Sequence, residues 1–200
     1  MLGSALRSDP LTASYGQGFF LGTRRRNGKT LQEIRGERAE IDDPTLVMGA
    51  ALRFLESRAR SAAEVRGRLV RHGYRPDLVE GCIGRLVELG MLDDAAFAQA
   101  WVESRDRARP RGERALRAEL RQKGVDRSVV DEVIQERADR AAANDGVDAD
   151  ADAAKRLLDR HLRALERIPD PRAKRERAYA LLARNGFDPD VAAEAIRSLG

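Results

Sequence analysis

The sequence predicts an all-α fold: an elongated array of three tandem three-helix repeats, preceded by a disordered N-terminal arm. Alanine (31 residues) and leucine (22) far outnumber valine (12), isoleucine (6) and threonine (4), which favours helices over strands. The net charge also alternates in sign, at +5, −5, +5, −6 and +6 in segments 45–75, 76–103, 104–127, 128–152 and 153–187. This alternation predicts a structural repeat of roughly 50–60 residues.

A glycine with the same apolar spacing occurs three times in the chain. Gly73, Gly124 and Gly186 each follow a leucine by four residues, and each precedes apolar residues at offsets +1, +5, +6 and +10. Glycine takes the left-handed conformation that ends a helix without steric cost. The last three offsets share one face of the helix that follows. Each glycine is therefore predicted to lie between the second and third helices of a repeat.

Local signals place the first two helices of the repeats. We expect the first helices near residues 45–58, 94–108 and 151–167, because apolar residues recur there at helical spacing. Ser61 and Glu64 have the spacing of a capping box, which predicts that the second helix of the first repeat begins after Ser61.

Acidic and glycine residues mark the second repeat in the same way. Asp93 and Asp94 could form a carboxylate pair, but they open a helix and are adequately explained as its N-cap. Phe97 is expected on the apolar face of this helix, and Pro110 and Gly112 separate it from its successor.

These signals divide the chain into five segments. They are the disordered N-terminal arm at 1–44 (with a short helical piece near 29–40), three-helix repeats at 45–92, 93–142 and 153–200, and an acidic linker at 143–152.

Basic residues are concentrated on the expected middle helices of the three repeats. They are Arg66, Arg68 and Arg71; Arg111, Arg114, Arg117, Arg121 and Lys123; and Arg172, Lys174, Arg175, Arg177 and Arg184. Spacings of three and four place Arg114, Arg117 and Arg121 on one side of a helix. If the repeats stack alike, these helices form a basic stripe suited to a nucleic-acid backbone or an acidic protein surface. The alternative is an ordinary solvated face on each helix.

The sequence indicates a protein that is not an enzyme and has no cofactor or metal site. His72 and His161 stand alone, and His72 is expected to be a capping or surface residue. Cys82 lies beside an apolar residue and is expected to be a buried structural thiol. The acidic segment 143–152 lacks the glycine and the closing glutamate of a calcium loop. Tyr74, Phe97, Trp101 and Phe187 are expected in the core rather than on a base-stacking surface.

Compartment signals are also absent from the sequence. The single cysteine excludes a disulfide framework and a cysteine zinc cluster. The chain has no apolar run of membrane-spanning length and no secretory signal. We therefore expect a cytosolic protein without a membrane partner.

Three passages of the sequence resemble the RecX family of bacterial recombinase regulators. The passages are Ala51-Leu52-Arg53-Phe54-Leu55 with Arg58, Arg60, Ser61 and Glu64; Gly90-Met91-Leu92-Asp93-Asp94 with Phe97 and Ala98; and Gly112 through Glu119-Leu120 to Lys123-Gly124-Val125. The resemblance covers roughly residues 45–200 and is looser in the third repeat. Residues 1–44 fall outside it.

The resemblance implies a modulator, usually inhibitory, of the RecA recombinase in DNA repair, homologous recombination and the SOS response. Family members are understood to bind the RecA filament on single-stranded DNA along its helical groove. They are understood to lower its ATPase, strand-exchange and coprotease activities. The expected partners are therefore the RecA filament and single-stranded DNA, with double-stranded DNA as a further candidate, for a monomeric protein.

Two alternatives remain open from the residues alone. A stand-alone nucleic-acid-binding module would need only the basic stripe, and a helical-repeat scaffold would bind another protein instead. The motif residues have structural roles, so the contacts are expected on the basic faces of the middle helices.

Overall fold

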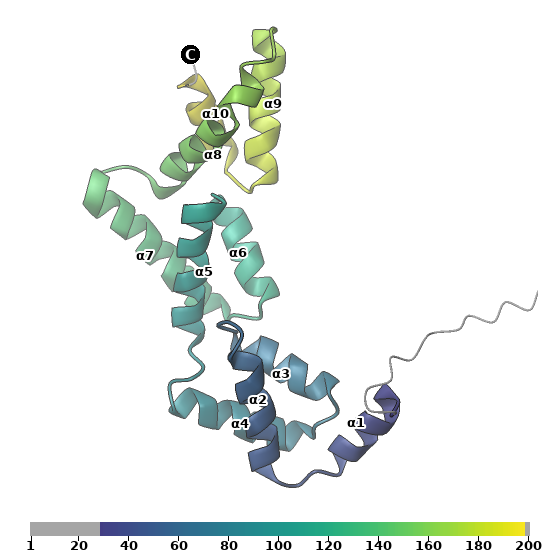
Figure 1. Ribbon diagram of the computed structural model, residues 1–200. Coiled ribbons are helices and arrows are strands. Elements are labelled where there is room, and N and C mark those ends of the chain that lie inside the picture. Colours follow the sequence, from purple (N-terminus) through teal and green to yellow (C-terminus); the bar gives the residue numbers. More distant parts are fainter. Residues whose placement is uncertain (1–28, 199–200) are drawn as a thin grey trace, which may run out of the picture.

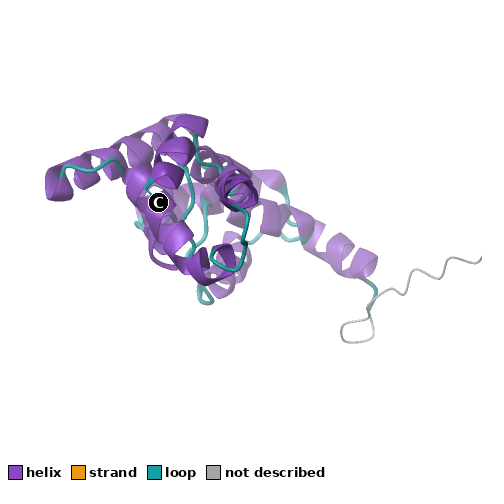
Figure 2. Ribbon diagram, turned by 90° about the horizontal axis from the view of Figure 1, so that it is seen from above, coloured by secondary structure: helices purple, strands orange, loops and turns teal. Residues whose placement is uncertain are grey.

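The computed structural model describes residues 29–198, in which ten helices follow one another without a strand (Figures 1 and 2). The helices are α1 (Leu31–Ala39), α2 (Pro44–Leu55), α3 (Ala62–Arg71), α4 (Pro76–Glu88), α5 (Asp94–Ala108), α6 (Glu113–Gln122), α7 (Arg127–Asp145), α8 (Ala149–Leu165), α9 (Pro171–Arg184) and α10 (Pro189–Arg197). The predicted all-α class is confirmed.

Three units of three helices succeed each other along an elongated molecule (Figure 1). Unit 1 consists of α2–α4, unit 2 of α5–α7 and unit 3 of α8–α10, and each buries its own apolar cluster. In each cluster a leucine of the middle helix is fully buried, namely Leu69, Leu120 and Leu182. Burial of such a side chain stabilises the fold by about 1.5–3 kcal/mol. The predicted array of tandem three-helix repeats is confirmed.

The repeated glycine ends the middle helix of every unit, as the sequence predicts. Gly73, Gly124 and Gly186 follow α3, α6 and α9 with φ angles of 98°, 75° and 81°. The backbone N–H after each glycine donates to the carbonyl of the leucine four residues before it, at 3.2–3.3 Å. This is the hydrogen bond of a Schellman motif. The motif explains why the leucine, the glycine and the next apolar residue keep a fixed spacing.

The described part of the predicted N-terminal arm contains the expected short helix. Residues 1–28 of the arm at 1–44 lie outside the described residues. The helical piece predicted near 29–40 is confirmed by α1, and α2 begins at Pro44, the last residue assigned to the arm. The capping box of Thr30 and Glu33 opens α1. Its helical signal is local, because each side chain bonds the other residue's backbone N–H.

Most of the predicted linker at 143–152 is helical. Helix α7 continues to Asp145 and α8 begins at Ala149. The Asp148 carboxylate accepts hydrogen bonds from the N–H groups of Asp150 and Ala151, at 2.9 and 2.8 Å. Carboxylates are favoured at a helix N-terminus, so the acidic run starts α8, and only the break at 146–148 lies between units 2 and 3.

The three middle helices form an end-to-end column. The C-terminal corner of α6 lies on the N-terminus of α3, because a Cβ added at Gly124 would overlap Ala63. The corner of α9 lies on the N-terminus of α6 in the same way, because a Cβ at Gly186 would overlap Ala115. Their dipoles therefore follow one another head to tail, and terminal carbonyls of one helix meet the N-terminal end of the next.

The first junction joins units 1 and 2. Ser61 Oγ accepts from the N–H of Glu64 at 3.1 Å, which completes the predicted capping box, and donates to the carbonyl of Lys123 at 2.5 Å. The Asp94 carboxylate accepts from the N–H of Ala62 at 2.8 Å. Asp93 caps α5, whereas the Asp94 carboxylate accepts a backbone N–H of α3 in the neighbouring unit.

The second junction repeats this arrangement between units 2 and 3 with different residues. The N–H of Gly112 donates to the carbonyl of Asn185 at 3.0 Å. The Asp150 carboxylate accepts from the N–H of Glu113 at 2.9 Å. Gly112 is buried against the backbone of Gly186, so the absence of a side chain is required at this contact.

Candidate nucleic-acid interface

Five of the thirteen basic residues expected to bind a partner are held by carboxylates of the fold. The pairs are Arg66 with Glu80, Arg111 with Glu119, Arg117 with Glu113 and Asp131, Lys123 with Glu64, and Arg172 with Glu176. Their charge is offset locally, so they add less to the field that a partner meets.

Two of these paired residues lie at the junctions of the column. Lys123 Nζ donates to Glu64 at 2.9 Å, and Arg111 donates to the side chain of Asn185. Burial alone would raise the pKa of Glu64, but hydrogen bonds from Lys123 and Arg58 outweigh burial and hold its pKa below the usual value. These contacts assign structural roles to Lys123 and Arg111.

The other eight basic residues make no ion pair within residues 29–198. They are Arg68, Arg71, Arg114, Arg121, Lys174, Arg175, Arg177 and Arg184. All lie on α3, α6 and α9, and all but the half-buried Lys174 are exposed. Because these helices form one column, the column carries uncompensated positive charge along its length. Guanidinium groups in such positions can bind phosphate or carboxylate oxygens.

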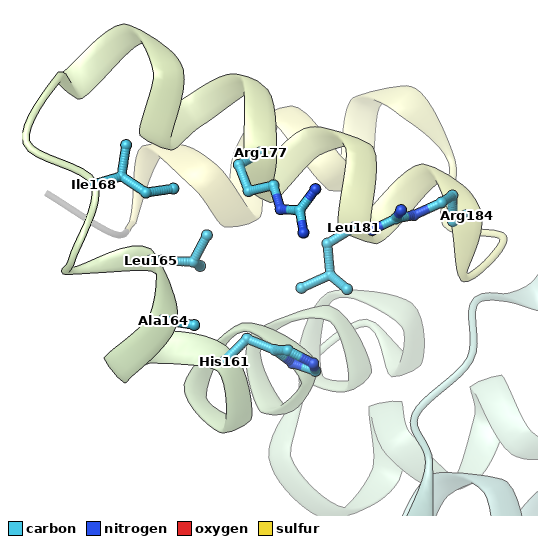
Figure 3. A pocket seen from close by; sticks show the side chains of 7 residues that line it. All are labelled: His161, Ala164, Leu165, Ile168, Arg177, Leu181 and Arg184. Carbon is cyan, nitrogen blue, oxygen red and sulfur yellow. The ribbon is translucent and has the colours of Figure 1, made fainter.

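A groove between α8 and α9 collects two of these arginines with a histidine (Figure 3). Arg177 and Arg184 come from α9 and His161 from α8, around apolar Leu165 and Leu181, with a cavity of about 400 Å³. His161 Nδ1 lies 2.9 Å from the carbonyl of Leu157. A carbonyl only accepts, so Nδ1 carries the hydrogen and Nε2 is the accepting nitrogen of the neutral ring. The groove can take an anionic group beside an apolar one.

The remaining sequence expectations concern buried residues. Phe97, Tyr74 and Phe187 are buried, as is Cys82, and all four predictions are confirmed. His72 is the C-cap of α3, in agreement with its predicted capping role.

Trp101 differs slightly from the predicted core position because it is only half-buried. Its Nε1–H donates to Glu119 at 2.8 Å. The guanidinium of Arg105 and the ammonium of Lys123 lie 4.3 and 4.9 Å from the ring centroid. A cation near the face of an indole ring is stabilised by its quadrupole, so these cations cover the ring.

Sequence reasoning missed a buried arginine at the second junction. Arg137 is only 7% exposed and donates to both oxygens of Asp106, at 2.9 and 3.0 Å, and to Asp150 at 2.7 Å. Burial raises the pKa of Asp150 despite these favourable bonds. The available signal was composition, because Arg137 is one of only two basic residues in the acidic segment 128–152.

Within 29–198, no three side chains of His, Cys, Asp or Glu converge as a metal site would require. None of the helices described there is both long and apolar enough to cross a membrane.

The fold defines a class, namely elongated helical-repeat proteins. Similarity to known proteins identifies the family within this class. The models of the first and second three-helix domains of RecX match residues 48–86 and 93–134. Regulatory protein RecX of Mycobacterium avium (strain 104) is 38% identical over 147 residues, which cover 72% of this chain and 79% of the relative. The chain belongs to the RecX family of regulatory proteins.

Other relatives agree with this assignment. Regulatory protein RecX of Mycobacterium sp. (strain JLS) is 40% identical over 148 residues, covering 72% of this chain and 76% of the relative. The crystal structure of RecX from Lactobacillus salivarius has a TM-score of 0.66 at 20% identity, covering 79% of this chain and 97% of that one. At that identity the likeness concerns the fold alone.

Proposed function

We propose that this protein is a negative regulator of the RecA recombinase that binds the RecA filament on single-stranded DNA along its helical groove. On binding it lowers the ATPase, strand-exchange and coprotease activities of the filament. It acts in the cytoplasm as a monomer, without catalysis of its own, in homologous recombination, DNA repair and the SOS response.

The observation that carries the proposal is the end-to-end column of α3, α6 and α9. An elongated array suits a helical groove, and its unpaired arginines suit a partner that presents phosphate and carboxylate groups together. Family membership supports RecA as the partner, because the relatives are named regulatory proteins of the RecX family.

The direct test is the single-stranded-DNA-dependent ATPase of RecA at physiological salt, with this protein added well below the RecA concentration. A marked drop at ratios too low to coat the DNA supports a filament regulator. No effect up to equimolar protein, with binding to naked DNA intact, contradicts the proposal and leaves a stand-alone nucleic-acid-binding module.

The contact surface is tested by Arg114→Glu combined with Arg121→Glu. Both residues are exposed on α6 and unpaired with carboxylates, so the folded state should persist. Arg117 stays unchanged, because it bonds Glu113 and Asp131 within the fold. The matched control is Arg163→Glu with Arg167→Glu, exposed in and just after α8.

The α6 variant is expected to inhibit the ATPase at least tenfold less strongly, a loss of about 1.4 kcal/mol of binding free energy. The control should inhibit nearly as well as the unmodified protein. Equal inhibition by all three proteins would show that the column does not contact the filament.

A further inference from the structure

A cavity of about 620 Å³ lies between α1, α2 and the end of α3. Its volume falls in the range of small-molecule sites, which is about 300–1,000 Å³. Helix α1 contributes Arg38 to the lining, α2 contributes Arg53 and Phe54, and α3 contributes Arg68. None of the sequence motifs accounts for this convergence, since Arg38 and Arg68 are 30 residues apart.

The positive charge in this cavity is poorly compensated. Its lining holds the guanidinium groups of Arg38, Arg53 and Arg68, together with Lys29. The single lining carboxylate, Glu37, pairs with Lys29. None of the three arginines makes an ion pair within the part of the chain that the structure describes. Like charges that converge without counterions repel one another, so a bound anion would relieve this repulsion.

Aromatic rings and a backbone carbonyl orient two of these cations, Arg38 and Arg68. The guanidinium of Arg38 lies 5.4 Å from the centre of the Tyr74 ring and donates to the carbonyl of His72 at 3.3 Å. The guanidinium of Arg68 lies 5.1 Å from the centre of the Phe54 ring. Contacts with a ring face orient a guanidinium and leave its N–H groups available. The guanidinium groups are therefore oriented, and some of their N–H groups remain free to bind a ligand.

A further arginine supports the same charge balance. The guanidinium of Arg60 lies 4.2 Å from the centre of the Phe54 ring, and its Nε is buried without a hydrogen-bond partner. Burial, and then the charge of Arg58, lower the pKa of Arg60. Arg60 thus adds a further cation beside the Phe54 ring.

Docking of α1 completes this cavity. Gly73 lies directly against α1, because a Cβ added there would come within 2.6 Å of the carbonyl oxygen of Arg35. Helix α1 thus covers the C-terminal corner of α3, as α3 covers the corner of α6. Without α1 the cavity would lose Arg38 and one of its walls.

We propose that this cavity is a phosphate-binding site. Guanidinium forks match the oxygens of phosphate, and the aromatic faces are already covered by cations, so recognition would involve the phosphate and not the base. A nucleic-acid backbone and a free nucleotide share this chemistry. The inference goes beyond the proposed function, because the site would hold phosphate whether or not a recombinase is present.

The test variant is Arg53→Ala combined with Arg68→Ala, two exposed residues whose loss should not unfold the protein. The control is Arg163→Ala with Arg167→Ala, which changes the net charge equally. Binding of a short labelled oligothymidine is measured by fluorescence anisotropy between about 50 and 200 mM salt. We expect about tenfold weaker binding for the test variant and, for two lost phosphate contacts, a salt slope shallower by about 1.4.

Inorganic phosphate serves as the second probe. It should raise the melting temperature of the unmodified protein and of the control, but not that of the test variant. ATP that competes with the oligothymidine at equal phosphate concentration would identify a free nucleotide as the source, and failure of ATP to compete would identify the backbone. Either result supports the site.

Two results would overturn the site. One is unchanged oligothymidine affinity and salt slope in the test variant. The other is displacement by an acidic peptide but not by phosphate, which would make the cavity a carboxylate site. If the test variant then still inhibited the RecA ATPase like the unmodified protein, the proposed function would stand while this inference fell.

Discussion

The two junctions of the column both supply acceptors for backbone N–H groups at the start of a middle helix, but they do so with different residues. At both, an aspartate from the next unit accepts a backbone N–H at the start of a middle helix, Asp94 at the first junction and Asp150 at the second. The first junction adds a Ser61 hydroxyl and a partly exposed pair of Lys123 with Glu64. The second adds the buried Arg137.

The difference shows which junction tolerates change. An ion pair that solvent still reaches contributes little to the free energy of unfolding, about 0–1 kcal/mol. A buried arginine bound to two carboxylates contributes little net stability as a set, but removing one member leaves an uncompensated buried charge. The second junction is therefore the more specific and the more easily broken of the two.

The largest effect is expected from Arg137→Ala. The substitution leaves the carboxylate of Asp150 without its cation and Asp106 with only the longer pair to Arg156, at 3.8 Å, at a cost of about 3–5 kcal/mol. Urea unfolding followed by circular dichroism measures this change. The control Arg140→Ala removes an exposed pair with Glu103 and should cost less than about 1 kcal/mol. Equal costs would refute the distinction between buried and exposed pairs.

Alanine substitutions at the corner glycines should destabilise the two junctions by different amounts, because the added Cβ meets different atoms. Gly186→Ala places a Cβ against the backbone N of Ala115, within 2.5 Å, whereas Gly124→Ala meets mainly the side chain of Ala63. Both substitutions should lose about 1–2 kcal/mol of stability, because alanine is disfavoured in the left-handed conformation. Gly186→Ala should lose about 1–3 kcal/mol more through the steric overlap. Gly90→Ala, with a φ of 67° and open space, measures the backbone cost alone. Three equal melting temperatures would contradict this ranking.

A smaller effect is expected from Ser61→Ala at the first junction. It removes the cap of α3 and the donor to the carbonyl of Lys123, at a cost of about 1 kcal/mol. Ser57→Ala, an exposed serine before the capping box, is the control. Matching unfolding midpoints for the two variants would show that the hydroxyl does not join the units.

The smallest effect is the pH dependence of stability, for which Glu64 at the first junction and Asp150 at the second should contribute with opposite signs. The pKa of Glu64 is lowered in the folded protein, so its contribution exists above the ordinary value of 4.5 and disappears as the pH falls through the folded pKa. The pKa of Asp150 is raised, so its contribution exists below the ordinary value of 3.8 and disappears as the pH rises through the folded pKa.

Unfolding free energies at pH 3 and pH 7 test this pair of signs. Glu64→Gln should destabilise the protein at pH 7 by less than about 1 kcal/mol and by less still at pH 3. Asp150→Asn mimics the protonated carboxyl, so its stability relative to the unmodified protein should rise from pH 3 to pH 7. The same pH trend in both variants would contradict the opposite shifts.

Local sequence was sufficient for the helices and their corners. The spacing of Leu120, Gly124 and Val125 describes one hydrogen-bonded corner, and Ser61 with Glu64 describes one capping box. Contacts that depend on distant residues could not be predicted this way. Arg137 meets Asp106 across 31 residues, and Arg117 meets Asp131 across 14. Ion pairing of an arginine therefore depends on how the helices pack, and local sequence alone does not predict it.

The end-to-end column also has a consequence for the length of the array. Each middle helix leaves an N-terminus that accepts the glycine corner of the unit after it, so the joint itself sets no limit on the number of units. At one end α1 covers the corner of α3. At the other, Asp170 accepts the N–H groups of Arg172 and Ala173 within α9, at 3.1 Å, much as Ser61 caps α3 within its own helix. In modular terms, the joint is a reusable connector that does not itself specify the number of units.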